Sequence, residues 1–190
     1  IRGRQFKEAT DAVARALATA SNSAEAWYQK GAVLHVLGQS RSALAAYDQS
    51  LKINANHTEA RVARAGLLID LKQTADAAQD LGVLASRSPG EPRAAYLRAL
   101  LAERNKDAPA VREALKQVTN LIDPVPVEYI RYRPQLLMLN GLSHYGLNEL
   151  EKAQQYLEAF QKVQANSAAS KLLAQIYMAQ NNLVRAVDVL

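Results

Sequence analysis

Residues able to bind metal or to act as acid–base catalysts are scattered along this chain rather than grouped. The three histidines, His35, His57 and His144, have no second histidine three or four residues away, so the usual helical spacing of zinc ligands is missing. We expect a surface or groove position for each of them. Gly82 and Gly90 are isolated, and neither precedes the Lys-Ser or Lys-Thr pair of a phosphate-binding loop.

The positions of the carboxylates and the lack of cysteine also argue against a catalytic or metal site. Glu149 and Glu151 stand at a predicted helix start, where negative charge is favourable in any helix. The chain has no cysteine, which excludes disulfides, thiol catalysis and cysteine-bound zinc, and it has no nucleophile-elbow motif. We therefore expect no catalytic residue, no cofactor, no metal and no enzymatic activity.

A repeat of 34 residues organises the elements that would position any functional side chain. Small residues recur in two columns, and larger apolar residues recur between them. Small side chains allow two antiparallel helices to approach closely, and a single hairpin cannot bury its apolar face alone, so hairpins must stack. The small columns are Gly31, Ala65, Ala99, Gly141 and Ala174, and then Ala9, Ala43, Ala77, Ala153 and Ala186.

The register predicts one solenoid over residues 1–190. It contains a partial repeat at 1–23, repeats at 24–57, 58–91 and 92–125, an insertion at 126–133, a repeat at 134–166 and a partial repeat at 167–190. Because both ends are incomplete repeats, we expect the chain to be part of a longer array. The predicted helices span residues 5–20, 24–37, 41–53, 58–71, 75–86, 91–104, 108–121, 134–147, 150–164, 167–180 and 183–190.

These columns resemble the consensus of the tetratricopeptide repeat (TPR) family. Trp27, Gly31, Leu34, Ala43 and Tyr47 carry the resemblance in one unit, and residues 148–153 with Leu157 carry it in another. It implies an all-α fold, a right-handed superhelical solenoid of antiparallel helix hairpins. The sequence departs from the consensus at Lys30 and Arg64, where a large apolar residue is usual, and this should loosen those units.

The resemblance also implies a concave groove lined by the first helix of each repeat. Family members that clamp a C-terminal carboxylate use Lys, Asn and Arg there, whereas this chain has Tyr, Met and aliphatic residues, so that clamp is missing. Aromatic side chains of this kind suit a protein or peptide partner, although each tyrosine could instead pack between neighbouring helices. The predicted groove residues are Tyr28, His35, Val62, Ile69, Tyr96, Leu100, Glu103, Met138, Leu142, Tyr145 and Met178.

The insertion is the least repeat-like stretch. Its prolines interrupt the helical pattern, and Tyr129, Arg131, Tyr132 and Arg133 alternate within it. It either contacts a partner or acts as a spacer whose aromatic side chains cover exposed core, and we favour the spacer.

Composition bounds the partner further. The net charge is +5, but basic residues are mixed with acidic ones, so nucleic acid is not favoured, and no apolar run is long enough for a transmembrane segment. Residues 133–145, 151–157 and 171–177 resemble the repeat lipoproteins of bacterial exopolysaccharide and PEP-CTERM sorting systems. That resemblance implies an envelope location, in the periplasm or at the outer membrane, and possible contact with polysaccharide machinery.

We therefore expect a non-catalytic protein–protein interaction scaffold that binds its partner in a groove. Two other functions stay open: a cytosolic adaptor or regulator that binds peptides, and the recruiting segment of a larger enzyme.

Overall fold

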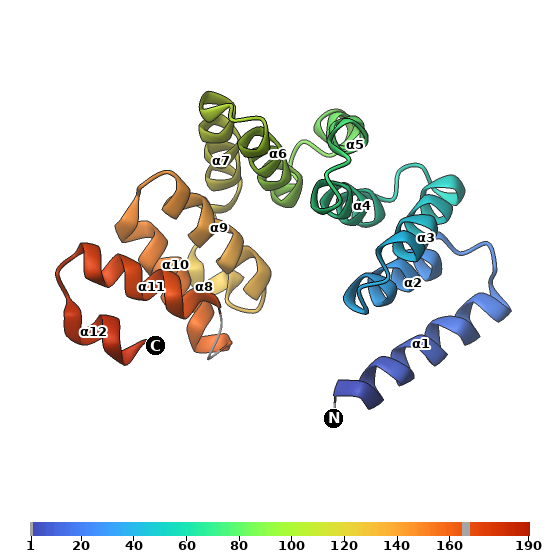
Figure 1. The fold of residues 1–190 in the computed structure, drawn as a ribbon, viewed down its shortest axis with the longest axis horizontal. Helices are drawn as coiled ribbons and strands as arrows, with labels where there is room; N and C mark the ends of the chain where they lie inside the picture. The colour runs from blue at the N-terminus through green and yellow to red at the C-terminus, as the bar shows by residue number, and fades with distance from the viewer. Residues whose placement is uncertain (1, 165–167) are drawn as a thin grey trace. The chain divides into compact units, whose positions relative to one another are not determined.

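A computed structural model describes residues 2–164 and 168–190 (Figure 1). Within these ranges the backbone forms twelve helices and no strand, which confirms the predicted all-α class. The helices are α1 Arg2–Thr19, α2 Ala24–Val36, α3 Ser40–Ile53, α4 Thr58–Asp70, α5 Thr74–Arg87, α6 Pro92–Arg104, α7 Ala108–Ile122, α8 Val127–Ile130, α9 Pro134–Gly146, α10 Leu150–Val163, α11 Ala168–Ala179 and α12 Leu183–Asp188.

The chain divides into two compact units, Ile1–Leu97 and Arg98–Leu190, and helix α6 contributes residues to both. In the first unit, α2 packs on α3, α3 on α4, and α4 on α5. In the second unit, α7 packs on α9, α9 on α10, α10 on α11, and α11 on α12. Each unit is therefore built from helices that pack on their neighbours in the chain. The repeat boundary predicted at 166/167 lies outside the described residues.

The small residues of the repeat sit where helices approach most closely. In the first unit, a Cβ on Gly31 would lie only 2.5 Å from Tyr47 Cδ1, and Tyr47 itself is buried. In the second unit, a Cβ on Gly141 would lie 2.8 Å from Leu157 Cγ, and Leu157 is fully buried. These glycines are required by the close approach of a large side chain from the second helix of the same hairpin.

A left-handed residue ends the turn that follows each first helix. Gly38, Lys72, Lys106, Asn148 and Asn181 all have positive φ. Such a residue closes the C-terminus of a helix by letting the next N–H groups reach its last carbonyls. Successive members are 34, 34, 42 and 33 residues apart, so the turn geometry repeats with the sequence period, and the longest interval is the one that contains α8.

The polar residues that interrupt the apolar pattern are paired. Arg64 donates to Asp80 from Nε at 2.8 Å and from Nη2 at 2.6 Å, and Arg61 donates to Asp80 at 2.8 Å. Asp80 is only 2% exposed. The ammonium of Lys30 lies 4.6 Å from the centroid of the Trp27 ring. Arg64 therefore fastens α4 to α5, and the expected loosening at this position is wrong, because a buried carboxylate supplies the partner.

The insertion forms the short helix α8, which the proline pattern did not predict. Ile130 is its buried residue, whereas the Tyr129 and Tyr132 side chains are 77% and 78% exposed. The aromatic side chains therefore do not cover the core, and the favoured spacer interpretation is wrong on this point because Ile130 fills that place instead.

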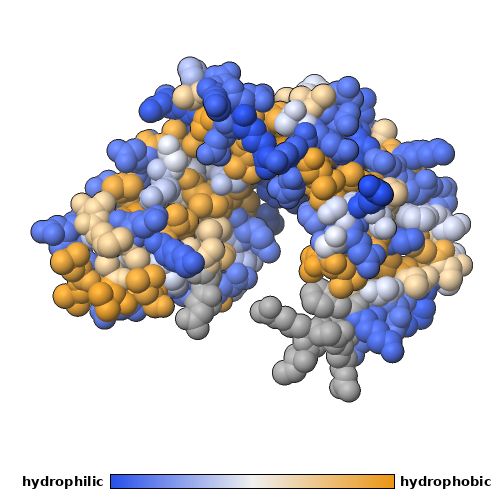
Figure 2. All heavy atoms as spheres, viewed as in Figure 1, coloured by the Kyte–Doolittle hydropathy of each residue, from blue (hydrophilic) through white to orange (hydrophobic). Residues whose placement is uncertain are grey.

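Apolar side chains also gather on the surface of α12, where Leu183, Val184 and Val187 are exposed (Figure 2, lower left). Among the described helices, none combines the length and apolar character that a membrane crossing requires.

Candidate functional site

The predicted groove residues divide between the two units. Val62 and Ile69 are buried, Glu103 and Met178 are exposed, and the remaining side chains are partly exposed. Their role in binding a partner stays a prediction. Tyr28, His35, Val62, Ile69 and Tyr96 lie in the first unit, and Leu100, Glu103, Met138, Leu142, Tyr145 and Met178 lie in the second.

Tyr28 belongs partly to the core of the first unit. Its ring centroid lies 6.2 Å from that of Tyr47 and 5.3 Å from that of His57. Burial raises the pKa of the Tyr28 hydroxyl. The charge of Arg93 lowers this pKa, and the nearby carboxylates of Glu25 and Glu59 raise it. Of the two roles left open for this tyrosine, packing is the one that these contacts support.

His57 connects the starts of α2 and α4. Its Nδ1 accepts from the backbone N–H of Ala60 at 3.3 Å, which caps α4. Because Nδ1 accepts there, the ring proton belongs on Nε2, which lies 3.1 Å from Glu25 Oε2 and donates to it. His57 is buried because it is the N-cap of α4, so the surface or groove position expected for it is wrong.

The row of charges continues along the first unit. Arg93 Nη2 lies 4.0 Å from Glu59 Oε1, and Arg93 donates to both carboxylate oxygens of Glu91 at 2.7 and 2.6 Å. Burial raises the pKa of Glu91, but hydrogen bonds from Arg93 outweigh burial and lower it. Arg93 is therefore paired closely with Glu91 and only at 4.0 Å with Glu59, so this row of three carboxylates and one guanidinium keeps a net negative charge.

The second unit presents a more open face on α9 and α11. The Tyr145 hydroxyl on α9 donates to Gln175 Oε1 on α11 at 3.1 Å, which joins two residues of the predicted inner stripe. Met138 and Leu142 lie on α9 and are partly exposed, and Met178 on α11 is 53% exposed. We call the surface formed by Met138, Leu142, Tyr145, Gln175 and Met178 the α9–α11 face.

Beneath that face lies a buried polar cluster. His144 is fully buried; its Nε2 lies 2.9 Å from Asp123 Oδ1 and its Nδ1 lies 2.7 Å from Glu149 Oε2. The surface position expected for His144 is therefore also wrong. Asn140 donates to Asp123 at 2.8 Å, and the Asn140 Oδ1 atom has no hydrogen-bond partner among the described residues.

The electrostatics of Asp123 follow from this crowding. Burial raises its pKa, but hydrogen bonds from Asn140, His144 and Lys152 outweigh burial and lower it to about 2. The cluster holds the end of α7 against α9 and α10.

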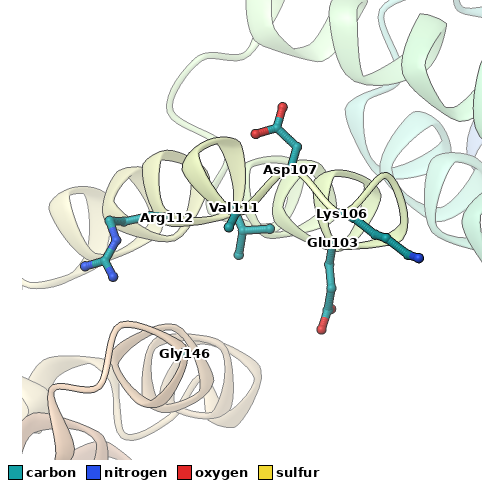
Figure 3. Close-up of a pocket in the computed structure, with 7 residues that line it drawn as sticks. Glu103, Lys106, Asp107, Val111, Arg112 and Gly146 are labelled. Carbon is teal, nitrogen blue, oxygen red and sulfur yellow. The ribbon is translucent and has the colours of Figure 1, made fainter.

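A cavity opens near the end of α9. It has a volume of about 340 Å³ and lies between the α6–α7 turn, the start of α7 and the last residue of α9 (Figure 3). Of its lining residues, only Glu103 was predicted as a groove residue. The lining residues of the α6–α7 turn and of α7 escaped prediction because they lie outside the stripe that the repeat pattern marks, whereas Gly146 is on the first helix α9. The lining residues are Glu103, Lys106, Asp107, Ala108, Val111, Arg112 and Gly146.

In the part of the chain that the structure describes, no three His, Cys, Asp or Glu side chains are grouped so that they could hold a metal ion.

Family models match two segments of the chain. Both models are described as tetratricopeptide repeats, and they match residues 24–57 and residues 138–190. No curated protein sequence matches the chain. Proteins of the tetratricopeptide type generally bind other proteins or peptides and are non-catalytic.

Solved structures with the same fold are distant in sequence. The Cut9–Hcn1 hetero-tetramer of the APC/C matches 98% of this chain with a TM-score of 0.74 and 12% identity, and this chain spans 37% of the length of that one. PilF of Pseudomonas aeruginosa matches 99% of this chain and 82% of its own, with a TM-score of 0.67 and 17% identity. YrrB, described as a TPR protein with an unusual peptide-binding site, matches 94% of this chain and 88% of its own, with a TM-score of 0.54 and 13% identity. At these identities the similarity shows the fold alone.

Proposed function

We propose that the chain is a non-catalytic interaction scaffold and that it binds a peptide segment of a protein partner on the α9–α11 face. The observation that carries this proposal is the hydrogen bond from Tyr145 to Gln175, which joins two first helices into one surface. Met138 and Leu142 line that surface on α9, and Met178 lines it on α11.

The chemistry of this face suits a peptide. Methionine is flexible and polarisable, so Met138 and Met178 can adapt to side chains of different shape. The carboxamide of Gln175 and the hydroxyl of Tyr145 can hydrogen-bond a peptide backbone, while the tyrosine ring offers apolar area. The peptide-binding description of YrrB, which has the same fold, supports this class of ligand.

The first unit is the weaker candidate for the same role. Two of its predicted groove residues, Val62 and Ile69, are buried, and Tyr28 packs against Tyr47 and His57. Arg93 of this unit is already paired with Glu91. A partner therefore finds fewer exposed apolar side chains there than on the α9–α11 face.

The chain's methionines give a direct test. Met138 and Met178 are its only two methionines, and both lie on the α9–α11 face. Peptides selected from a displayed random library against the chain should shift both methyl signals in NMR spectra of ¹³C-methyl-methionine-labelled protein. Because the carboxylate clamp is missing, peptides with amidated C-termini should bind as well as those with free carboxylates.

Two variants with the same change of composition separate this face from the rest of the unit. Lys171→Glu with Met178→Glu alters α11 on the face, and Lys162→Glu with Val163→Glu alters α10 at side chains of equal exposure: Met178 is 53% and Val163 is 50% exposed. The selected peptides should lose affinity for the α11 variant only. Equal binding to both variants would show that the peptides use another surface.

The biological setting is a separate proposal. The resemblance of residues 133–177 to exopolysaccharide and PEP-CTERM lipoproteins supports an envelope location, whereas a cytosolic adaptor and a recruiting segment of a larger enzyme remain the alternatives. Fractionation of cells that express the whole gene would separate them, since recovery in the cytosol contradicts the envelope proposal.

A further inference from the structure

The cavity beside the end of α9 is lined by charged side chains that the proposed function does not use. Its volume of about 340 Å³ is at the lower end of the range of ligand pockets. It is therefore suited to one or two side chains of a longer ligand. All of its lining residues belong to the second unit, as does the α9–α11 face.

Three charged side chains line this cavity without ionic partners. Glu103, Lys106 and Arg112 are exposed, and none of them forms an ion pair or a side-chain hydrogen bond with the residues that the structure describes. Asp107 differs, because its carboxylate caps α7 by accepting from the backbone N–H of Ala110 at 3.0 Å. Figure 3 shows Asp107 pointing away from Gly146, whereas Glu103 points toward the gap above α9.

The remaining walls are apolar or lack a side chain. Val111 lies between the two cations and is partly buried. Opposite it, Gly146 presents only backbone, and a Cβ there would lie 2.7 Å from Leu115 Cδ1. Helix α9 therefore approaches α7 closely at Gly146, and the absence of a side chain keeps this side of the cavity free.

We propose that this cavity anchors one acidic side chain of the bound peptide, with the carboxylate on Arg112, whose side chain points toward α9 (Figure 3). The inference rests on the proposed peptide-binding function and adds the chemistry of one ligand residue. An apolar side chain next to the acidic residue packs on Val111, and Glu103 accepts a backbone N–H of the peptide.

The balance of charge selects a single acidic residue. Arg112 faces the ligand from α7, whereas Lys106 points away from α9 (Figure 3), and a guanidinium group binds a carboxylate through charge-assisted hydrogen bonds. Glu103 repels a second carboxylate, so a continuous acidic run is disfavoured. Exposure of the cations keeps them hydrated and screened, so the anchor adds selectivity to a binding free energy that comes chiefly from the α9–α11 face.

Three capped peptides test the anchor. They share one peptide sequence selected against the chain and carry Glu, Gln or Lys at the position that contacts the cavity, which is found by substituting each peptide residue in turn. In ¹H–¹⁵N NMR titrations, the Glu peptide should shift the amide signals of Val111, Arg112 and Gly146. It should bind about tenfold more tightly than the Gln peptide, the change expected for one charge-assisted contact, and the Lys peptide should bind most weakly.

A charge-reversed variant provides the matched control. Arg112→Glu should reduce affinity for the Glu peptide about tenfold and reverse the order of the Glu and Lys peptides. Lys162→Glu, which changes an exposed lysine on α10 outside the cavity, should leave that order unchanged. The anchor is overturned if the Met138 and Met178 methyl signals shift while the cavity amides do not, or if Arg112→Glu leaves the order unchanged. Either result leaves the peptide-binding face intact, whereas selected peptides that shift neither the methyl signals nor the amides overturn the proposed function itself.

Discussion

His144 Nε2 lies 2.9 Å from Asp123 Oδ1, and this contact joins the last turn of α9 to the end of α7. The other ring nitrogen faces Glu149 Oε2 at 2.7 Å. Each ring nitrogen of His144 therefore lies within hydrogen-bonding distance of a carboxylate oxygen. The second unit thus contains a fully buried imidazole between two carboxylates.

Removing the imidazole should destabilise the second unit strongly. We expect His144→Ala to lower the free energy of unfolding by about 3–5 kcal/mol, because it removes a fully buried ring and its contact with Asp123 and opens a cavity. Glu149→Gln should cost less, since Glu149 is partly exposed and its replacement can still accept from Nδ1. Urea unfolding followed by the Met138 and Met178 methyl signals measures both, and an equal loss in the two variants would contradict this account.

Asp123 should make the second unit sensitive to acid. Its folded-state pKa of about 2 lies below its ordinary value of 3.8, so the stabilisation is complete above pH about 4 and is lost as the pH falls toward 2. After allowance for screening, we expect about 1–2 kcal/mol from this group. Asp123→Asn should be less stable than wild type at pH about 7 and should lose less on acidification, as measured by urea unfolding at each pH. A variant that loses as much stability as wild type between these pH values would contradict the assignment.

The sequence pattern located the helices well because one period governs packing along the whole chain. The columns of Gly31 and Ala43 mark the surfaces where helices meet, and the structure buries both residues. The same columns held a signal for the buried histidine: His144 stands in the column of Leu34, Leu68 and Tyr177, which predicts an inward side chain.

The partners of the buried polar groups were not predictable in the same way. Asp123 lies 21 residues before His144 and Asp80 lies 16 residues after Arg64, on other helices in both cases. Periodicity assigns a face to each residue but does not say which charge on the next helix meets it. For the candidate site, the pattern found Tyr145 and Met178, but it could not find Lys106 or Arg112, which become lining residues only when α7 and α9 pack together.

The buried carboxylate of Asp80 should contribute more to the free energy of unfolding of the first unit than either arginine that binds it. Asp80→Ala removes the buried partner of two partly buried guanidinium groups and leaves Arg64 with Asp48 and Arg61 with the Ala55 carbonyl, so we expect a loss of about 2–4 kcal/mol. Arg64→Leu leaves Asp80 paired with Arg61, so the loss should be about 1–3 kcal/mol. Trp27 is the chain's single tryptophan and lies in the first unit, so its fluorescence during urea unfolding reports on this unit. A larger loss in Arg64→Leu than in Asp80→Ala would show that the arginine matters for another reason.

Two glycines of the first unit should respond oppositely to the same substitution. Gly31→Ala places a Cβ against the Tyr47 ring, and we expect a loss of about 1–3 kcal/mol from overpacking. Gly82 lies within α5 with no neighbouring atom near the position of a Cβ, so Gly82→Ala should gain about 0.5–1 kcal/mol. Trp27 fluorescence during urea unfolding measures both changes. A gain in Gly31→Ala would mean that the ring of Tyr47 moves aside at no cost.

Substitutions of buried and exposed residues around α8 should have different effects on the stability of the second unit. Ile130 is buried, so Ile130→Ala should lower the free energy of unfolding of the second unit by about 2 kcal/mol or more. Tyr129→Ser and Tyr132→Ser alter side chains that are 77% and 78% exposed, so each should change the free energy by no more than about 0.5 kcal/mol. Tyr132 also stacks with Arg131, whose guanidinium lies 4.8 Å from the ring centroid, but an exposed contact of this kind adds little to stability. Urea unfolding followed by the methionine methyl signals distinguishes the three variants. A large loss in either tyrosine variant would restore the interpretation of these rings as covers of the core.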